Sequence, residues 1–232
     1  RTRTAAIRRG MMRLMTRNNA VNMALVVLLS IVAVIFLLSL SQERLGNFTI
    51  SLAQTDQYKY GIELSETAAF SMTSGRLEAD SIQRATNISI RDLPDGLHEK
   101  DGSHNGQSYI AYTFYVRNNG KADFNYRYSV DIKEVTKQLD TAARVGIYYN
   151  GQDRTIYARN GADGKPEPDT TPFASDTVID SGVILDMKVG TVDKYTIVIW
   201  IEGDDPQCTD ERLGGVLKMA MTISVITEDE PV

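Results

Sequence analysis

Apolar and polar residues alternate with a period of two along most of the sequence from residue 46 onward. This period is typical of β-strands that bury one face. It is present at residues 48–52, less clear at 58–64, and short at 87–90. It is strongest at 110–116 and 124–130, where every second residue is aromatic or aliphatic. The pattern predicts a domain built mainly of short strands.

Asn-Gly dipeptides mark the expected turns, because both residues adopt positive φ angles readily. Asn118-Asn119-Gly120 separates the two strongest runs and predicts a hairpin between them. Asn150-Gly151 predicts a second hairpin over residues 145–158. The segment 160–171 is rich in Gly, Pro and Asp, which predicts an exposed loop.

One segment departs from the period of two. Ile132, Val135 and Leu139 fall at helical spacing and predict a short helix that ends near Ala142 and Ala143. We therefore expect one short helix inserted among the strands.

The last two apolar runs are the clearest. Residues 195–201 are apolar on both faces, which predicts a central strand covered on both sides, with Trp200 in the core. Residues 216–227 alternate and predict a half-buried strand. Roughly eight to ten short strands in all indicate an all-β domain, a sandwich of jelly-roll or Greek-key type.

The first forty residues have a different pattern. The 18 residues from Met23 to Leu40 carry no charge, and with Val21 and Asn22 they reach the ~20 residues that span a bilayer. Six arginines precede this run, and the first acidic residue is Glu43. We therefore expect the segment to contact the lipid bilayer as a single helix.

The positive-inside rule then divides the chain. Residues 1–20 form a basic cytoplasmic tail, 21–41 a transmembrane helix, and 42–232 an extracellular β-sandwich domain. The alternative is a cleaved signal peptide, with Ser39 and Ser41 as the small residues at the cleavage site. The apolar run is longer than the ~7–15 residues of a usual signal core, which favours an uncleaved anchor.

Charge and cysteine content narrow the possible partners and the cellular location of the protein. Without the six N-terminal arginines, 19 basic residues face 30 acidic ones, a formal charge of −11. This balance argues against a nucleic-acid partner and against docking on an anionic membrane. Cys208 is the single cysteine, so the chain has no internal disulfide, which fits a Gram-positive surface better than a eukaryotic secretory pathway. Its thiol joins two protomers, reacts, or is a small half-buried residue.

Three stretches together resemble a known family. They are "SGRLEA" at 74–79, "YTFYVRNNGKADFNYRYSVDI" at 112–132 and "KYTIVIWIEGDDPQCTD" at 194–210. They look like the TasA/camelysin family of Gram-positive surface and biofilm-matrix proteins, and in particular its membrane-anchored clostridial members. The resemblance implies an extracytoplasmic jelly roll that serves in the envelope, in a matrix with other proteins, or in fibres.

The resemblance also implies self-association by strand exchange and, from camelysin, a metalloprotease. For exchange we expect residues 42–64 to be the donor, with Phe48, Ile50 and Leu52 filling an acceptor groove. For the protease, the HExxH motif is absent. We expect no enzymatic activity, no catalytic residue and no obligatory cofactor.

A calcium loop is the first candidate site. Asp101, Ser103 and Asn105, followed by Gly106, match the first half of a loop whose alternate side-chain oxygens bind Ca²⁺. The twelfth position is Tyr112, where an EF-hand has Glu, so a carboxylate from elsewhere would be required. Plain turns at Asp-Gly and Asn-Gly are the alternative, and the missing ligand favours them.

Zinc is the weaker metal hypothesis. His98, Glu99, Asp101 and His104 lie within seven residues, but in a Gly-rich polar stretch that is more simply a solvated loop.

An acidic loop is the second candidate site. Glu202, Asp204, Asp205 and Asp210, with the neighbouring Glu211, are enough carboxylates for a cation site or an acid/base pair. They cluster among turn-forming Gly and Pro residues, which favours a structural connection. We therefore predict a non-enzymatic, membrane-anchored surface protein. A calcium- or glycan-binding surface module is the alternative, and a peptidase or glycosidase is the third hypothesis.

Overall fold

The computed structural model describes residues 22–23, 25–34, 43–53 and 55–226. The chain forms two compact units, Arg1–Ser41 and Gln42–Val232. In the first, residues 22–23 and 25–34 are helical, and their apolar side chains are exposed. Within the described residues, no helix has both the length and the apolar character needed to span a membrane. The predicted tail 1–20 and much of the predicted segment 21–41 lie outside these residues.

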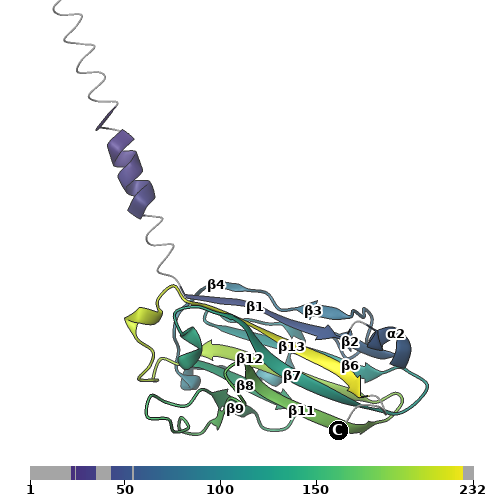
Figure 1. The fold of residues 1–232 in the computed structure, drawn as a ribbon. Coiled ribbons are helices and arrows are strands. Elements are labelled where there is room, and N and C mark those ends of the chain that lie inside the picture. Colours follow the sequence, from purple (N-terminus) through teal and green to yellow (C-terminus); the bar gives the residue numbers. More distant parts are fainter. Residues whose placement is uncertain (1–21, 24, 35–42, 54, 227–232) are drawn as a thin grey trace, which may run out of the picture. The chain divides into compact units, whose positions relative to one another are not determined.

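The second unit contains two β-sheets (Figure 1). Residues of both sheets contribute to one apolar core. Sheet A has the strand order β11-β7-β13-β1-β3, and β4 also pairs with β1. Its strands are β1 (Glu43–Leu52), β3 (Arg76–Glu78), β4 (Ile82–Ala85), β7 (Phe124–Val135), β11 (Val178–Met187) and β13 (Val216–Ile226).

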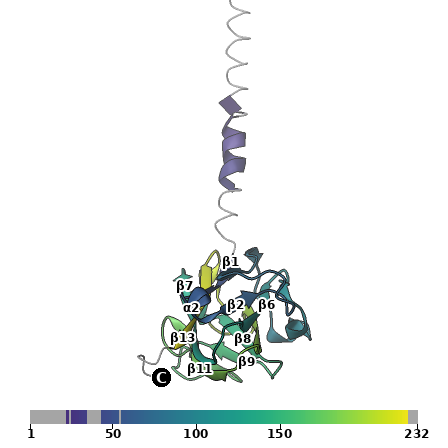
Figure 2. The same cartoon turned by 90° about the vertical axis from the view of Figure 1, so that its right-hand side faces the viewer.

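Sheet B has the order β10-β9-β8-β12-β6-β2, and β5 also pairs with β6. In Figure 2, β7 and β13 lie on one side of the domain and β6 and β8 on the other. The all-β class predicted from the sequence is confirmed. The strands of sheet B are β2 (Ile62–Ser65), β5 (Gly102–Ser103), β6 (Tyr109–Asn118), β8 (Ala143–Tyr149), β9 (Thr155–Ala158), β10 (Thr171–Pro172) and β12 (Val192–Ile201).

Short helical segments connect several strands. They are the α-helix α2 (Asp56–Tyr60) and the 3₁₀ helices η1 (Ile90–Asp92), η2 (Leu97–Glu99), η3 (Leu139–Thr141) and η4 (Asp210–Arg212).

The strand predictions for the last two apolar runs, 195–201 and 216–227, are confirmed as β12 and β13. β12 pairs with β6 along one edge and with β8 along the other, so it is central in sheet B. Its residues Ile197 and Ile199 belong to the core between the sheets, whereas Val198 and Trp200 belong to a second apolar cluster. β13 buries every second residue from Leu217 onward, as its alternation predicts.

The predicted hairpin at 145–158 is confirmed as β8 and β9, which pair antiparallel. Its tip has positive φ at both Asn150 (49°) and Gly151 (74°), the combination that an Asn-Gly turn supplies. The predicted loop at 160–171 has no regular structure before Thr171, where β10 begins.

The predicted hairpin between the two strongest runs is wrong. β6 belongs to sheet B and β7 to sheet A. Both edges of β6 are occupied, by β12 on one side and by β2 and β5 on the other, so β7 pairs with β13 and β11 instead. Asn118 fixes the crossover, because its side-chain amide donates to the carbonyl oxygens of Ala122 (3.0 Å) and Met187 (2.9 Å).

The predicted helix at 132–143 is also wrong. β7 continues to Val135, since Ile132 and Val135 pair with Met219 and Leu217 of β13. Two residues with positive φ, Lys137 (53°) and Gln138 (51°), then reverse the chain. Leu139 reaches the core from the separate turn η3, so the helical spacing joins residues of two different elements.

The weaker strand predictions hold only in part. Residues 58–64 divide into the end of α2 and the strand β2. At 87–90 a single bridge joins Ile88 to Glu202. Ser89 then caps η1. Its side-chain oxygen accepts from the Arg91 backbone N–H, and the Asp92 carboxylate accepts from the Ser89 backbone N–H. The local capping interaction replaces an extended strand here.

The run at 48–52 forms β1, which lies inside sheet A. It pairs parallel with β13 and antiparallel with β3 and β4. Phe48 and Ile50 are fully buried and Leu52 is nearly so. The first and last strands of this unit are therefore neighbours, although about 170 residues separate them in sequence.

Candidate functional site

The outer face of sheet B is covered by chain that follows β4. Leu93 and Leu97, from the segment around η1 and η2, pack on Ala111 of β6 and on Val198 and Trp200 of β12. This is the second apolar cluster, and all five residues are buried. Covering a sheet face with irregular chain gives the protein a place where a cleft can form beside the cover.

A cleft of about 490 Å³ lies next to this cluster. Its wall comes from η1, β8, β9, the loop before β10, and the acidic connection after β12. The lining residues are Ile90, Arg91, Arg144, Ile156, Glu167, Pro168, Asp169, Thr170, Trp200, Glu202, Asp204, Asp205 and Pro206.

Glu202 anchors the acidic connection to the floor of the cleft. Its Oε2 accepts hydrogen bonds from Trp200 Nε1 (3.0 Å) and from Ile90 N (3.0 Å). Its Oε1 accepts from Asp204 N (3.2 Å). Three N–H donors therefore satisfy a carboxylate that is only 7% exposed, as a buried charge requires.

Asp205 and Arg144 form a buried ion pair. Arg144 Nη2 donates to Asp205 Oδ2 at 2.6 Å, and Glu167 Oε2 lies 3.7 Å from the same nitrogen. The other oxygen of Asp205 accepts from Gln207 N at 2.7 Å. Arg144 lies opposite Trp200 in the pairing of β8 with β12, so the regular sheet positions both side chains.

The remaining acidic residues lie closer to solvent. Asp204 Oδ2 accepts from Ser89 Oγ (2.8 Å) and from Arg91 Nη2 (3.1 Å) at the rim of the cleft. Asp210 begins η4, is exposed and does not line the cleft. The structure therefore brings together three of the four predicted acidic residues, Glu202, Asp204 and Asp205.

The oxygens of the predicted calcium loop face different partners. Asp101 Oδ1 accepts from the Tyr115 hydroxyl (2.5 Å), and Ser103 Oγ accepts from Asp80 N (3.2 Å). Asn105 holds a turn, with Oδ1 accepting from Ala111 N (2.9 Å) and Nδ2 donating to the Asp80 carbonyl oxygen (2.6 Å). A calcium site at these residues stays a prediction.

The two histidines lie in different surroundings. His98 stacks on Tyr148 with ring centroids 5.0 Å apart, whereas His104 Nδ1 lies 2.9 Å from the carbonyl oxygen of Gly102. Among the described residues, no group of three or more His, Cys, Asp or Glu side chains is placed to hold a metal ion.

A buried tyrosine cluster crosses between the sheets, which the sequence did not predict. The Tyr126 hydroxyl of β7 donates to Asp193 Oδ2 (2.7 Å) and lies 2.9 Å from the Tyr195 hydroxyl of β12. Burial raises the pKa of Tyr126 and Tyr195 far above the usual value. Burial also raises the pKa of Tyr149, which packs on Tyr195, to about 12. The alternation at 110–116 and 124–130 is consistent with the burial of the Tyr112 and Tyr126 rings, but it does not identify their carboxylate partners, Glu66 and Asp193.

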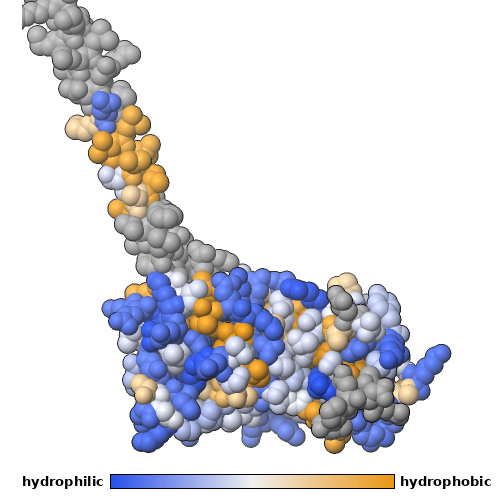
Figure 3. Space-filling view, viewed as in Figure 1, coloured by the Kyte–Doolittle hydropathy of each residue, from blue (hydrophilic) through white to orange (hydrophobic). Residues whose placement is uncertain are grey.

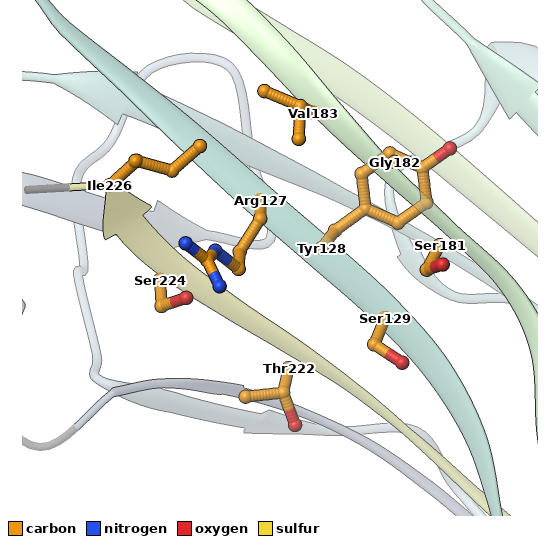
Figure 4. Close-up of a pocket in the computed structure, with 9 residues that line it drawn as sticks. All are labelled: Arg127, Tyr128, Ser129, Ser181, Gly182, Val183, Thr222, Ser224 and Ile226. Carbon is orange, nitrogen blue, oxygen red and sulfur yellow. The ribbon is translucent and has the colours of Figure 1, made fainter. Parts of the chain in front are cut away.

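The outer face of sheet A carries a second, shallower hollow of about 450 Å³ (Figure 4). One row of hydroxyl side chains crosses four paired strands at Ser51, Thr222, Ser129 and Ser181, and the last three of these line the hollow. Arg127, Val183 and Ile226 surround the hollow, as the figure shows. The side of the domain seen in Figure 3 carries many hydrophilic residues, with hydrophobic residues gathered between them.

Cys208 is half-buried against the main core and accepts a hydrogen bond from Asn87 Nδ2 at 3.2 Å. This agrees with the interpretation of the cysteine as a small packed residue, and it ties the acidic connection to the segment that covers sheet B.

Comparison with known proteins adds only distant structural likenesses. No family model matches the sequence, and no curated protein does. Among solved structures, one match is a β-glucosidase from Kluyveromyces marxianus in complex with glucose, which is 12% identical in sequence. The match covers 72% of this chain and 16% of the β-glucosidase, with a TM-score of 0.27. Another match is AvmM, which catalyses macrocyclization in alchivemycin A biosynthesis and is 7% identical. This match covers 53% of this chain and 82% of AvmM, with a TM-score of 0.23. The chain thus spans about a sixth of the β-glucosidase, and scores this low carry no inference about activity.

Proposed function

We propose that the chain is a non-enzymatic surface module of a Gram-positive bacterium, anchored by its N-terminal apolar segment. Residues 1–20 are then cytoplasmic, 21–41 cross the membrane, and 42–232 form an extracellular jelly-roll domain that serves in the envelope, in a matrix or in fibres. The charge-free run from Met23 to Leu40 and the six arginines before it support this orientation. The resemblance to the TasA/camelysin family supports the role.

The observation that carries the non-enzymatic assignment is the state of the cleft carboxylates. Glu202 and Asp205, the two buried acidic residues of the cleft wall, each accept hydrogen bonds from fixed donors of the protein itself. A general acid or base must exchange a proton with a substrate within hydrogen-bond reach. Carboxylates held in this way instead fix the shape of the acidic connection.

Protease treatment of intact cells tests the location. We expect external protease to remove the domain from Gram-positive cells that express the full chain, and a membrane-embedded N-terminal fragment to remain. Protection of the domain until the cells are lysed would contradict the proposal. Hydrolysis of casein by the purified full chain, abolished by a metal chelator, would contradict the non-enzymatic part alone.

Assembly by strand exchange is the finer part of the proposal. The pairing of β1 with β13, β3 and β4 means that exchange requires this strand to leave one copy and enter sheet A of another. Light scattering after size exclusion measures this directly. A full chain in detergent that keeps the mass of one copy at high concentration would overturn exchange, but not the surface location.

A ligand-binding surface module is the second candidate, favoured by the cleft of about 490 Å³ on the outer face of sheet B. For calcium, a rise in the melting temperature of the full chain at millimolar Ca²⁺, lost in Asp101→Ala, is the expected sign. An unchanged melting temperature would count against calcium.

A further inference from the structure

We propose that the cleft binds a primary ammonium or guanidinium group on an apolar stem, as in a lysine or arginine side chain of a partner peptide. The proposal rests on the proposed function only in that the cleft binds without reacting. It does not depend on the membrane anchor or on the location of the domain. Three features of the cleft support it: its size, its apolar floor and its charge.

The floor of the cleft suits a hydrocarbon stem. Ile90 and Ile156 are half-buried and Pro168 and Pro206 are exposed, so all four offer apolar surface to a ligand, whereas Trp200 is fully buried behind this lining. Lysine and arginine bury their methylene groups along apolar surface while the charged head stays near water. The volume of about 490 Å³ lies in the range of small-ligand pockets and exceeds what one bare ion needs.

The charge of the wall selects a cation. Five carboxylates line the cleft against two guanidinium groups, which leaves a formal charge of −3. Arg144 is already shared by Asp205 and Glu167. Asp169 accepts no hydrogen bond from any other described residue and is exposed at the mouth. A recess of one charge sign with apolar walls concentrates ions of the opposite sign, whereas a phosphate or carboxylate ligand would be repelled.

The rim shows how such a group is held. Arg91 of η1 places its guanidinium 3.1 Å from Asp204 Oδ2, and both side chains are largely exposed, at 82% and 59%. An exposed ion pair of this kind is weak. A cation from a partner therefore replaces Arg91 on Asp204 at little cost, and Asp169 supplies the second carboxylate at the mouth.

The hydrogen bonds of the wall favour an ammonium or guanidinium group over a metal ion in the cleft. The oxygens of Glu202 and Asp205 already accept protein donors, so a metal would have to displace those hydrogen bonds. A protonated amine needs only the two outer carboxylates, those of Asp204 and Asp169.

The single tryptophan provides the readout, since Trp200 lines the cleft. The full chain in uncharged detergent is titrated with the peptide acetyl-Ala-Lys-Ala-amide and, separately, with the same peptide acetylated on the lysine amine. We expect a saturable change of tryptophan fluorescence with the first peptide and at least about tenfold weaker binding of the second. Acetylation removes the positive charge but keeps the stem.

Matched variants locate the site. Asp204→Asn combined with Asp169→Asn should weaken binding of the lysine peptide about threefold to tenfold, as expected for the loss of exposed ion pairs. Arg91→Ala should strengthen it, because the competing cation is gone. Asp153→Asn is the control for the loss of an exposed carboxylate elsewhere, since Asp153 is exposed in the β8–β9 turn, outside the cleft.

Three results would overturn the proposal. One is equal binding of the acetylated and the unmodified peptide. Another is equal weakening by Asp153→Asn and by the Asp204/Asp169 pair. The third is a saturable response to calcium chloride with none to the lysine peptide, which would assign the cleft to a metal instead. None of these results bears on the location of the domain, which the protease experiment tests separately.

Discussion

The two sheets differ in what lies on their outer faces. Sheet A is open over β7, β11 and β13, where small hydroxyl side chains such as Ser129 and Thr222 surround a shallow hollow. Sheet B is covered by the segment around η1 and η2, which builds a second apolar cluster. Buried charges accompany the covered face, where Arg144 and Asp205 are almost inaccessible. Irregular chain packed on sheet B thus accompanies buried charges beside a cleft, whereas the hollow on sheet A lies on an uncovered face.

Among the substitutions that test this difference between the sheets, Trp200→Ala should lower the free energy of unfolding most. It removes the largest fully buried side chain from beneath the cover of sheet B and deprives Glu202 of one donor. We expect the free energy of unfolding to fall by about 4 kcal/mol, from the cavity and the lost hydrogen bond. Denaturant unfolding of the full chain measures it. Trp200→Phe keeps most of the ring and should cost clearly less; equal losses would show that the ring does not support the cover.

Arg144→Met tests whether the buried pair depends on its partner. Asp205 would be left buried with only the Gln207 backbone N–H as donor. We therefore expect the free energy of unfolding to fall by about 3 kcal/mol. Replacing both partners, Arg144→Met with Asp205→Leu, should recover much of that loss, because no unpaired charge remains. A double variant no more stable than the single one would mean that packing, and not the uncompensated charge, dominates.

Alkaline pH tests the tyrosines between the sheets. Burial raises the pKa of Tyr149 and of Tyr157 to about 12, above the unfolded value near 10. Because the neutral form is favoured in the folded state, this contribution to stability is complete below pH 10 and is lost as pH rises from 10 towards 12. The tyrosinate absorbance of these two tyrosines should therefore appear only above pH 10, together with unfolding. Complete ionization of all tyrosines near pH 10 in the folded protein would contradict the burial.

Thr222→Ala should have the smallest effect. Thr222 lies on the outer face of sheet A and lines its shallow hollow, so we expect a change within about 0.5 kcal/mol. The same denaturant measurement applies. A loss comparable to that of Arg144→Met would show that the open face is also an organised site, and the contrast between the sheets would fail.

Much of the fold could be predicted from the alternation of residues, and less of the pairing. The periods of β12 and β13 predicted their burial because alternation follows directly from covering one or both faces of a strand. The hairpin between β6 and β7 was wrong because a turn sequence does not reveal that both edges of β6 are occupied. The helix at 132–143 was wrong because helical spacing arose by chance from β7 and η3 together.

The candidate site was likewise predictable only in part. The acidic connection after β12 was recognised from its carboxylates, and its main character as a structural turn agrees with the hydrogen bonds of Glu202 and Asp205. The partners of these residues were not predictable. Arg144 and Ile90 lie 61 and 112 positions away from them in the sequence, and no local pattern links such distances.

The sequence by itself determined the all-β class, the central strand that contains Trp200, and the hairpin at Asn150-Gly151. These depend on the burial of alternate side chains and on the backbone angles of single turns, which neighbouring residues control. Only the tertiary structure decided which strands pair, where the chain crosses between sheets, and which charges share the cleft. Those choices depend on free sheet edges and on desolvation, and both are properties of the whole assembled domain.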